Sequence, residues 1–283
     1  MELLPIWKAS IFEGLGSLIL IWFIGIASPV FTLNSPVGVG AGLAFLYGSA
    51  VALIMFALKP ITGAHINPFI TLSHLLVGTE KSLFRGGAYI LSQMIGAVIG
   101  GGFVAGALGS DAVALSNGGC VVDSGNTGMF KPQQAVALEF MAALVLLVLA
   151  HSKFSQSQPH STSLTPFLYG LSVGLLNFCT SGFAPHAGYI GSFGFPNVCF
   201  GLSMGIMKFQ PVHWVFWIPG FAAVILHGAI YRFLKPYDSQ NDSENSEMTG
   251  HKNIIVPFPS SVFQRDQKGS GQGFETFGNS SVV

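Results

Sequence analysis

The stretch Thr62-Gly63-Ala64-His65-Ile66-Asn67-Pro68-Phe69-Ile70-Thr71 decides the fold of this chain, and a second stretch far downstream resembles it: Ile190-Gly191-Ser192-Phe193-Gly194-Phe195-Pro196-Asn197-Val198-Cys199. Each is a short turn that leads into an apolar segment of about ten residues, which is too short to span a bilayer. Proline at the first helical position, with Asn67 directly before Pro68, is a strong helix-start signal. Two half-length helices in equivalent places of two halves point to a transport site at the membrane midplane.

The composition is that of a polytopic membrane protein. Half of the 283 residues (50%) are hydrophobic and only 8% are charged, against roughly 25% in a soluble domain. The 36 glycines fit closely packed membrane helices. Basic and acidic residues balance at 12 each, so no nucleic-acid partner is expected. Three cysteines predict no disulfide framework.

Six apolar runs are long enough to cross a lipid bilayer as helices. They are Ala9–Phe31, Val37–Leu58, Gly87–Leu108, Gln134–His151, Leu164–Phe183 and His213–Leu234. The half-length segments lie between the second and third runs and between the fifth and sixth. The polar segment Gly109–Gln133 is expected to form a surface loop.

Lysine and arginine are distributed unequally between the two sides of the predicted spans. With the N-terminus inside, ten of these residues lie on the inner side and two, Lys131 and Lys208, on the outer side. This bias predicts that both termini are cytoplasmic. We expect the plasma membrane as the location, with an internal membrane as the alternative. A channel domain is expected over residues 1–236, followed by a disordered cytoplasmic tail over 237–283.

The two halves of the chain repeat one another. Glu13 and Glu139 are 126 residues apart, and Pro68 and Pro196 are 128 apart. This spacing predicts two copies of a unit with three spans and one half-helix, at about 9–110 and 133–234. Because three spans is an odd number, the second copy must be inverted. The half-helix N-termini, which carry partial positive charge, then meet inside the membrane.

Such a meeting point repels cations, including hydronium, and offers hydrogen bonds to an uncharged solute. The amide of Asn67 would supply a directed donor there. The sequence shows no paired carboxylates of a cleft, no nucleotide-binding loop, no metal-ligand spacing and no Ser-His-Asp set. We therefore expect no enzyme activity, no catalytic residue, no metal and no cofactor.

Two motifs resemble those of the aquaporins, or major intrinsic proteins: Gly63–Pro68, and the run His213–Gly220 at the start of the sixth span. The resemblance covers about Trp7 to Leu234. It implies an all-α membrane protein with six tilted transmembrane helices and two re-entrant half-helices, one pore per subunit, and a homotetramer. Asn117-Gly118-Gly119-Cys120, together with Cys199 after the usual filter arginine position, is similar to the X intrinsic proteins of fungi and plants.

The resemblance also implies roles for individual residues. The pore midpoint would be formed by Asn67, Pro68, Phe69, Phe195, Pro196 and Asn197, and the selectivity filter by Tyr47, Asn177, Ser192 and Val198. Glu13 and Glu139 would hold the re-entrant loops, with a proton relay as the alternative. His65 would support its loop or line the inner vestibule, with pH gating as the alternative.

The chain departs from the family pattern at the second motif. Phe195 stands where asparagine is usual, an asparagine appears two residues later at Asn197, and Val198 stands where arginine is usual. In the first motif, Phe69 is bulkier than the usual alanine. Loss of the arginine predicts a wider, less polar filter that favours larger neutral solutes such as glycerol. Phe195 as a plug is the opposing interpretation.

Three functions are therefore open. The first is a passive channel for small uncharged solutes, water or glycerol-like polyols. The others are an aquaporin-like protein that does not conduct and has a structural or regulatory role, and an ion-leaky pore caused by Val198. For the cysteines, we expect a pore-side thiol or packed residue at Cys199, a core residue at Cys179, and an intersubunit disulfide or free thiol at Cys120.

Overall fold

The computed structural model describes residues 5–34, 39–116, 120–122, 131–152, 161–181, 189 and 191–234. The chain divides into two units, Met1–Lys235 and Pro236–Val283. The predicted tail over residues 237–283 and the motif residues 117–119 lie outside the described residues.

Six long helices correspond to the six predicted spans. They are α1 (Ile6–Asn34), α2 (Val39–Thr62), α4 (Leu83–Leu108), α6 (Pro132–Ala150), α8 (Ser161–Ser181) and α10 (Ile218–Phe233). α4 begins before the predicted Gly87 because the hydroxyl of Ser82 accepts a hydrogen bond from the N–H of Arg85 at 3.1 Å and caps the helix. The predicted sixth span is divided: a 3₁₀ turn, His213–Phe216, precedes α10, whose first turn contains Pro219.

Within the described part of the chain, five segments are long and apolar enough to cross a membrane: α1, α2, α4, α6 and the turn with α10. α8 has a comparable length, 21 residues, but includes several serines and threonines, which lower its hydropathy. The predicted all-α membrane architecture is confirmed.

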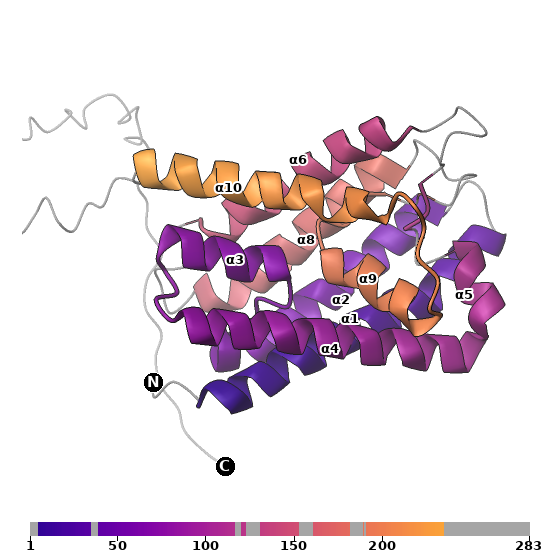
Figure 1. Cartoon of the computed structure of the whole chain (residues 1–283), viewed down its shortest axis with the longest axis horizontal. Coiled ribbons are helices and arrows are strands. Elements are labelled where there is room, and N and C mark those ends of the chain that lie inside the picture. Colours follow the sequence, from indigo (N-terminus) through magenta and orange to yellow (C-terminus); the bar gives the residue numbers. More distant parts are fainter. Residues whose placement is uncertain are drawn as a thin grey trace, which may run out of the picture. The chain divides into compact units, whose positions relative to one another are not determined.

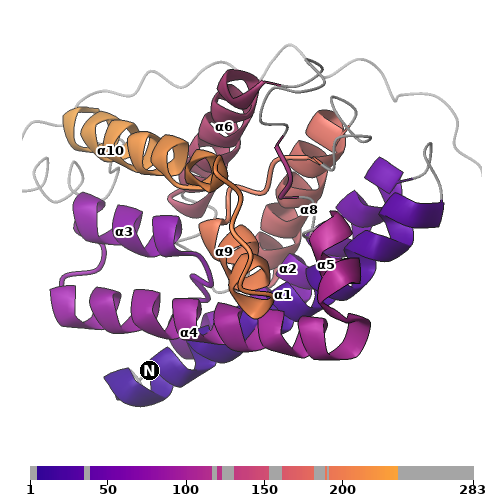
Figure 2. The same cartoon turned by 45° about the vertical axis from the view of Figure 1, so that its right-hand side comes forward.

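Two half-length helices lie between the long ones. α3 (Pro68–Val77) and α9 (Pro196–Gly205) each have ten residues and begin at the predicted prolines. The side chain of Asn67 caps α3 by accepting from the N–H of Phe69 at 2.9 Å, whereas Phe195 offers α9 no such cap. Figures 1 and 2 both show α3 and α9 between α4 and α10.

Glycines allow the helix backbones to touch. A Cβ added to Gly96, on α4, would lie 1.9 Å from the carbonyl oxygen of Gly14 on α1, and one added to Gly101 would lie 1.9 Å from that of Gly201 on α9. Either substitution would therefore push α4 away from its neighbour. The first contact holds α4 against α1, and the second holds the half-helix α9 against the full-length helix α4.

The segment predicted as a loop, Gly109–Gln133, contains a short helix, so that prediction was wrong in part. α5 spans Ser110–Ser116. Gly109, with φ of 82°, ends α4, and Asp111 in the first turn of α5 favours a new helix start.

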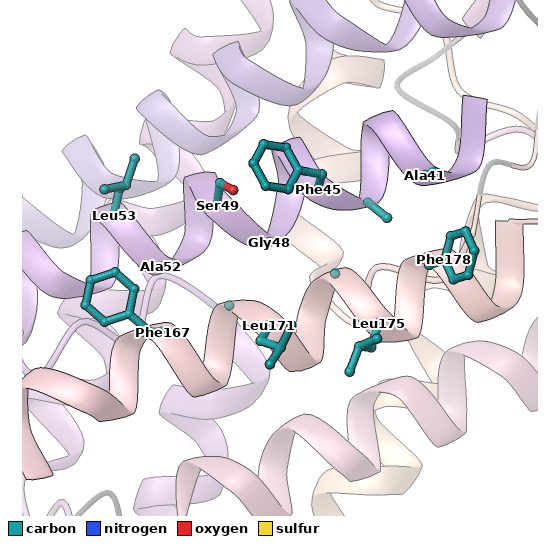
Figure 3. A pocket seen from close by; sticks show the side chains of 13 residues that line it. Ala41, Phe45, Gly48, Ser49, Ala52, Leu53, Phe167, Leu171, Leu175 and Phe178 are labelled. Atoms are coloured by element: carbon teal, nitrogen blue, oxygen red, sulfur yellow. The ribbon is translucent and has the colours of Figure 1, made fainter. Parts of the chain in front are cut away.

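α2 and α8 pack together and leave an apolar groove of about 500 Å³ on their outer side. Figure 3 shows Phe45 and Leu53 on α2, and Phe167 and Leu175 on α8, along this groove. Apolar lining is expected of a surface that faces lipid or another membrane helix.

Candidate functional site

A buried carboxylate holds the turn that precedes α3. Glu13, on α1, is fully buried and accepts hydrogen bonds from the backbone N–H groups of His65, at 3.0 Å, and Ile66, at 2.6 Å. The amide of Gln93, on α4, donates to the same carboxylate at 2.9 Å. A carboxylate inside a membrane is destabilising unless donors surround it, and these three groups, together with the hydroxyl of Thr62 at 2.5 Å, supply the donors.

Glu139, on α6, contacts the turn before α9 in the same way. Its carboxylate accepts from the N–H groups of Phe193, at 3.4 Å, and Gly194, at 3.2 Å, and from the hydroxyl of Tyr189 at 3.1 Å. Gly194 lies two residues before Pro196, as Ile66 lies two residues before Pro68. The two halves of the chain therefore make equivalent hydrogen bonds at equivalent positions.

The backbone at this equivalent position is left-handed in both turns. φ is 42° at Ile66 and 62° at Gly194. A positive φ is unfavourable for a β-branched residue such as Ile66, and such strain persists only where the surroundings enforce it. The short hydrogen bond from the N–H of Ile66 to Glu13 is one such restraint.

Reciprocal side-chain hydrogen bonds join the N-terminal ends of the half-helices. Nδ2 of Asn67 donates to the carbonyl of Gly194 at 2.8 Å. Nδ2 of Asn197 donates to the carbonyl of Ile66 at 3.0 Å and to Oγ of Ser17 at 3.2 Å. Two helix ends with partial positive charge thus meet inside the bundle.

The four predicted filter residues are all buried, with exposed fractions of 1% or less. They are Tyr47 on α2, Asn177 on α8, Ser192 in the turn before α9, and Val198 on α9. The Tyr47 hydroxyl donates to the carbonyl of Phe193 at 3.3 Å. A Cβ added to Gly191 would lie 2.7 Å from Nδ2 of Asn177, so the amide packs against the backbone next to Ser192.

The hydroxyl of Ser192 already has a partner, because its Oγ lies 2.7 Å from the Tyr189 hydroxyl. The backbone N–H of Ser192 donates to the hydroxyl of Thr180 at 2.7 Å. Val198 lies in the first turn of α9 and contributes only apolar surface there.

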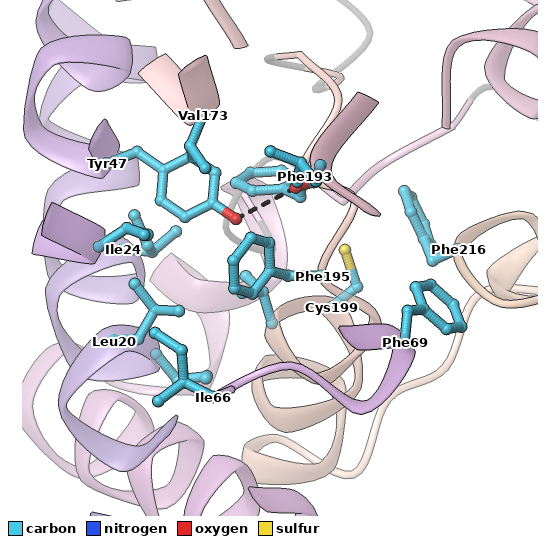
Figure 4. Packing of buried hydrophobic residues seen from close by; sticks show 14 of the residues in the cluster. Leu20, Ile24, Tyr47, Ile66, Phe69, Val173, Phe193, Phe195, Cys199 and Phe216 are labelled. Atoms are coloured by element: carbon cyan, nitrogen blue, oxygen red, sulfur yellow. Dashed lines mark hydrogen bonds between the residues drawn. The ribbon is translucent and has the colours of Figure 1, made fainter. Parts of the chain in front are cut away.

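Three aromatic rings pack together beside the filter (Figure 4). The ring of Tyr47 lies 5.1 Å from that of Phe193 and 5.9 Å from that of Phe195, measured between centroids. All three side chains, which we call the aromatic cluster, have exposed fractions of 2% or less. In this conformation solvent does not reach the three rings of the aromatic cluster.

The ring of Phe69, a residue predicted at the pore midpoint, packs against aromatic side chains at the start of α10. The ring lies 5.3 Å from that of Phe221 and 6.5 Å from that of Trp217. Figure 4 shows it near Phe216 and apart from the aromatic cluster. The structure therefore places Phe69 against α10 and Phe195 against α2.

Comparison with known proteins identifies the family. A family model described as Major intrinsic protein matches residues 1–231. The chain belongs to the major intrinsic protein family.

Similar proteins include Aquaporin-5 from Sus scrofa, 31% identical over 227 residues that cover 80% of each chain. Aquaporin-1 from Homo sapiens is 25% identical over 233 residues, covering 81% of this chain and 82% of its own. The aquaglyceroporin structure from Plasmodium falciparum has a TM-score of 0.61 at 18% identity, and covers 80% of this chain and 96% of its own. At that identity the likeness shows the fold alone.

Proteins of this family are membrane channels for water or small solutes, and this major intrinsic protein is therefore an integral membrane protein of the same general function. The assignment to the X intrinsic proteins stays a prediction, because the relatives named above are Aquaporin-5 and Aquaporin-1.

The structure corrects the predictions of a free thiol or intersubunit disulfide at Cys120, a pore-side thiol at Cys199 and a core residue at Cys179, whereas Cys199 is fully buried, as its packed-residue alternative expected. Cys120 and Cys199 form an intrachain disulfide, so neither is a free thiol and Cys120 is not available to a second subunit. Cys179, expected in the core, is exposed. The disulfide joins the segment after α5 to α9, one residue beyond Val198.

Four histidines form a continuous row of ring contacts that the sequence did not predict, and within this row only the His65–His74 pair is stacked. The ring of His65 lies 4.4 Å from that of His74 on α3, which lies 4.3 Å from that of His151 at the end of α6. The His151 ring in turn lies 4.7 Å from that of His227 on α10. These four residues, the histidine row, connect the turn held by Glu13 to two long helices. Among the described residues no three His, Cys, Asp or Glu side chains are grouped to hold a metal ion.

Proposed function

We propose that this major intrinsic protein is a passive channel for small uncharged solutes and that it carries glycerol-like polyols as well as water. The supporting observation is the character of the filter. Its four predicted residues, Tyr47, Asn177, Ser192 and Val198, include no positively charged side chain. A filter without arginine presents fewer fixed donors and more apolar surface, which suits solutes with a carbon chain.

Exclusion of cations does not depend on an arginine alone. The N-termini of α3 and α9 are held together by the bonds of Asn67 and Asn197, and their partial positive charges repel cations. We therefore propose a pore that is selective against protons and metal ions in spite of Val198.

The second candidate function is that of an aquaporin-like protein that does not conduct. The aromatic cluster favours it, because Phe195 and Phe193 pack on Tyr47 and leave these side chains 2% exposed or less. In this alternative the rings stay in place, and the fold serves a structural or regulatory role.

Swelling and shrinkage of proteoliposomes distinguish the candidates. Purified protein is reconstituted, and water and glycerol permeabilities are measured by stopped-flow light scattering against empty vesicles. The channel proposal expects both permeabilities to exceed those of empty vesicles. Flux that appears only in Phe195→Asn would indicate a pore closed by the ring, and no flux in either protein would support the non-conducting candidate. A steady current across a planar bilayer would instead indicate an ion-leaky pore.

We also propose that both termini are cytoplasmic, that the protein lies in the plasma membrane and that it is a homotetramer. The Lys and Arg distribution supports the orientation, and the family resemblance supports the assembly. Protease access to tags at each end of the chain in sealed vesicles tests the orientation. Fluorescence microscopy of the tagged protein tests the location, and light scattering after gel filtration tests the oligomeric state.

A further inference from the structure

One face of α8 carries three buried side chains, and the middle one lies beside the aromatic cluster. Tyr169, Val173 and Asn177 follow one another at intervals of four residues and have exposed fractions of 3%, 1% and 0%. Residues four apart share one face of a helix. Figure 4 shows Val173 beside Tyr47, so this buried face of α8 lies against the proposed filter.

The polar groups on this face are unpartnered. In the part of the chain that the structure describes, neither the Tyr169 hydroxyl nor either amide atom of Asn177 has a hydrogen-bond partner. Three other buried or half-buried tyrosines behave differently: the hydroxyl of Tyr47 donates to a carbonyl, that of Tyr89 donates to a carbonyl, and that of Tyr189 donates to a carboxylate. Buried polar groups are nearly always paired, so each exception requires an explanation.

We infer that the Tyr169 hydroxyl and the Asn177 amide are contact sites for the hydroxyl groups of a permeating polyol. The inference rests on the proposed channel function and names two residues of α8 that set its substrate class. Asn177 was placed in the filter by family resemblance, whereas no motif pointed to Tyr169.

The spacing of the two groups gives two contacts in succession. Eight residues of helix separate Tyr169 from Asn177, which is about 12 Å along the axis. Val173 lies between them on the helix, beside the ring of Tyr47 (Figure 4). A polyol of three or four carbons is shorter than this distance, so it leaves one polar contact, passes the apolar side chains, and reaches the next.

The chemistry of the contacts favours a polyol over other uncharged solutes. A carboxamide and a phenol can each donate and accept a hydrogen bond, and so can an alcohol. A polyol loses several hydrogen bonds to water when it enters a narrow pore, whereas a water molecule loses fewer. Replacement donors and acceptors along the path therefore matter more to the polyol, while Val173 offers contact to its carbon atoms.

The test removes one hydroxyl at a time. Tyr169→Phe deletes only the phenol oxygen, and Ser172→Ala deletes a hydroxyl from the exposed side of α8, where it bonds to the carbonyl of Leu168. In proteoliposomes, Tyr169→Phe is expected to lower glycerol and erythritol permeability roughly fivefold, the effect of about one hydrogen bond, with water permeability changed less than about twofold. Ser172→Ala is expected to change none of the three.

Thermal unfolding in detergent gives a second measurement that does not depend on flux. If the Tyr169 hydroxyl has no partner in the folded protein, Tyr169→Phe leaves the unfolding temperature unchanged or raises it. A lower unfolding temperature, an equal loss of water and polyol flux, or polyol flux equal to wild type would each overturn the inference. Wild-type vesicles without any flux would overturn the proposed function first, and the inference with it.

Discussion

Asn197 donates from its amide to the carbonyl of Ile66 at 3.0 Å, across 131 residues of sequence. The same amide donates to Ser17 on α1, so one side chain connects α9, the turn before α3, and a full-length helix. The opposite bond, from Asn67 to Gly194, completes the pair. Although Asn197 lies two residues beyond the usual place of the family's asparagine, its side chain still reaches across to the other half-helix.

Replacement of Asn197 is therefore expected to destabilise the junction. Asn197→Leu keeps a similar volume but removes two hydrogen bonds and leaves the Ile66 carbonyl without this donor. We expect the free energy of unfolding to fall by about 1–3 kcal/mol, as measured by thermal or denaturant unfolding in detergent. Asn177→Leu is the matched control, because that amide has no partner among the described residues and its loss is not expected to destabilise. Equal destabilisation by both variants would contradict this assignment.

Much of this architecture could be predicted from local sequence. Asn67-Pro68 and Pro196 mark helix starts by their own backbone chemistry, and both half-helices begin there. The spacing of Glu13 and Glu139 indicated two related halves, and the carboxylates contact residues at equivalent positions. Such features depend on apolar run length and on short motifs, which a sequence displays directly.

Other features depend on which side chains meet in space, and no local pattern encodes them. Three cysteines allow several pairings, and only the packing of α9 brings Cys199 to Cys120. The histidine row combines residues from four separate elements. The place of the Phe69 ring depends on Gly220, where an added Cβ would lie 2.0 Å from that ring.

Phe195→Asn is expected to raise water permeability if the aromatic cluster closes the path. The substitution removes a ring that packs 5.9 Å from Tyr47 and restores an amide next to Pro196. Phe69→Leu is a control, because that ring packs on α10, and it is expected to leave the permeability ratio of water to glycerol unchanged. Stopped-flow measurements of water permeability in proteoliposomes test this prediction. Unchanged water flux in a folded Phe195→Asn protein would show that the Phe195 ring lies outside the path.

Val198→Arg is expected to lower glycerol permeability more than water permeability. Val198 is fully buried in the first turn of α9, so a longer, charged side chain narrows the proposed filter. The added charge also strengthens repulsion of cations at a helix N-terminus. Val198→Leu adds bulk without charge and separates the two effects. Equal loss of glycerol and water flux in Val198→Arg would argue against a filter position for Val198.

Thiol labelling should find one reactive cysteine before reduction. Cys179 is exposed, while Cys120 and Cys199 are bonded to each other. We expect one maleimide per chain in detergent under non-reducing conditions and three after reduction and denaturation. In the double variant Cys120→Ser, Cys199→Ser, the free energy of unfolding should fall by about 4 kcal/mol. The reason is that the disulfide closes a loop of 79 residues and so restricts the unfolded chain. Three reactive thiols in the oxidised protein would contradict the disulfide.

Acidification is expected to destabilise the protein through His151. This residue caps the C-terminal end of α6, just beyond the span, and burial lowers the pKa of its imidazole to about 4. The nearby imidazoles of His227 and His65 also lower the pKa, whereas the hydrogen bond to the Leu147 carbonyl opposes them. The unfolded chain takes up a proton below about pH 6.5, and the folded chain does so only near pH 4. The contribution of neutral His151 to the free energy of unfolding is therefore complete above about pH 6.5 and is lost as the pH falls toward 4.

Unfolding temperatures measured between pH 8 and 4 test this prediction. His151→Asn is the control, because its amide can still donate to the Leu147 carbonyl but does not titrate. The variant should depend less on pH, and identical pH profiles would show that His151 is not responsible.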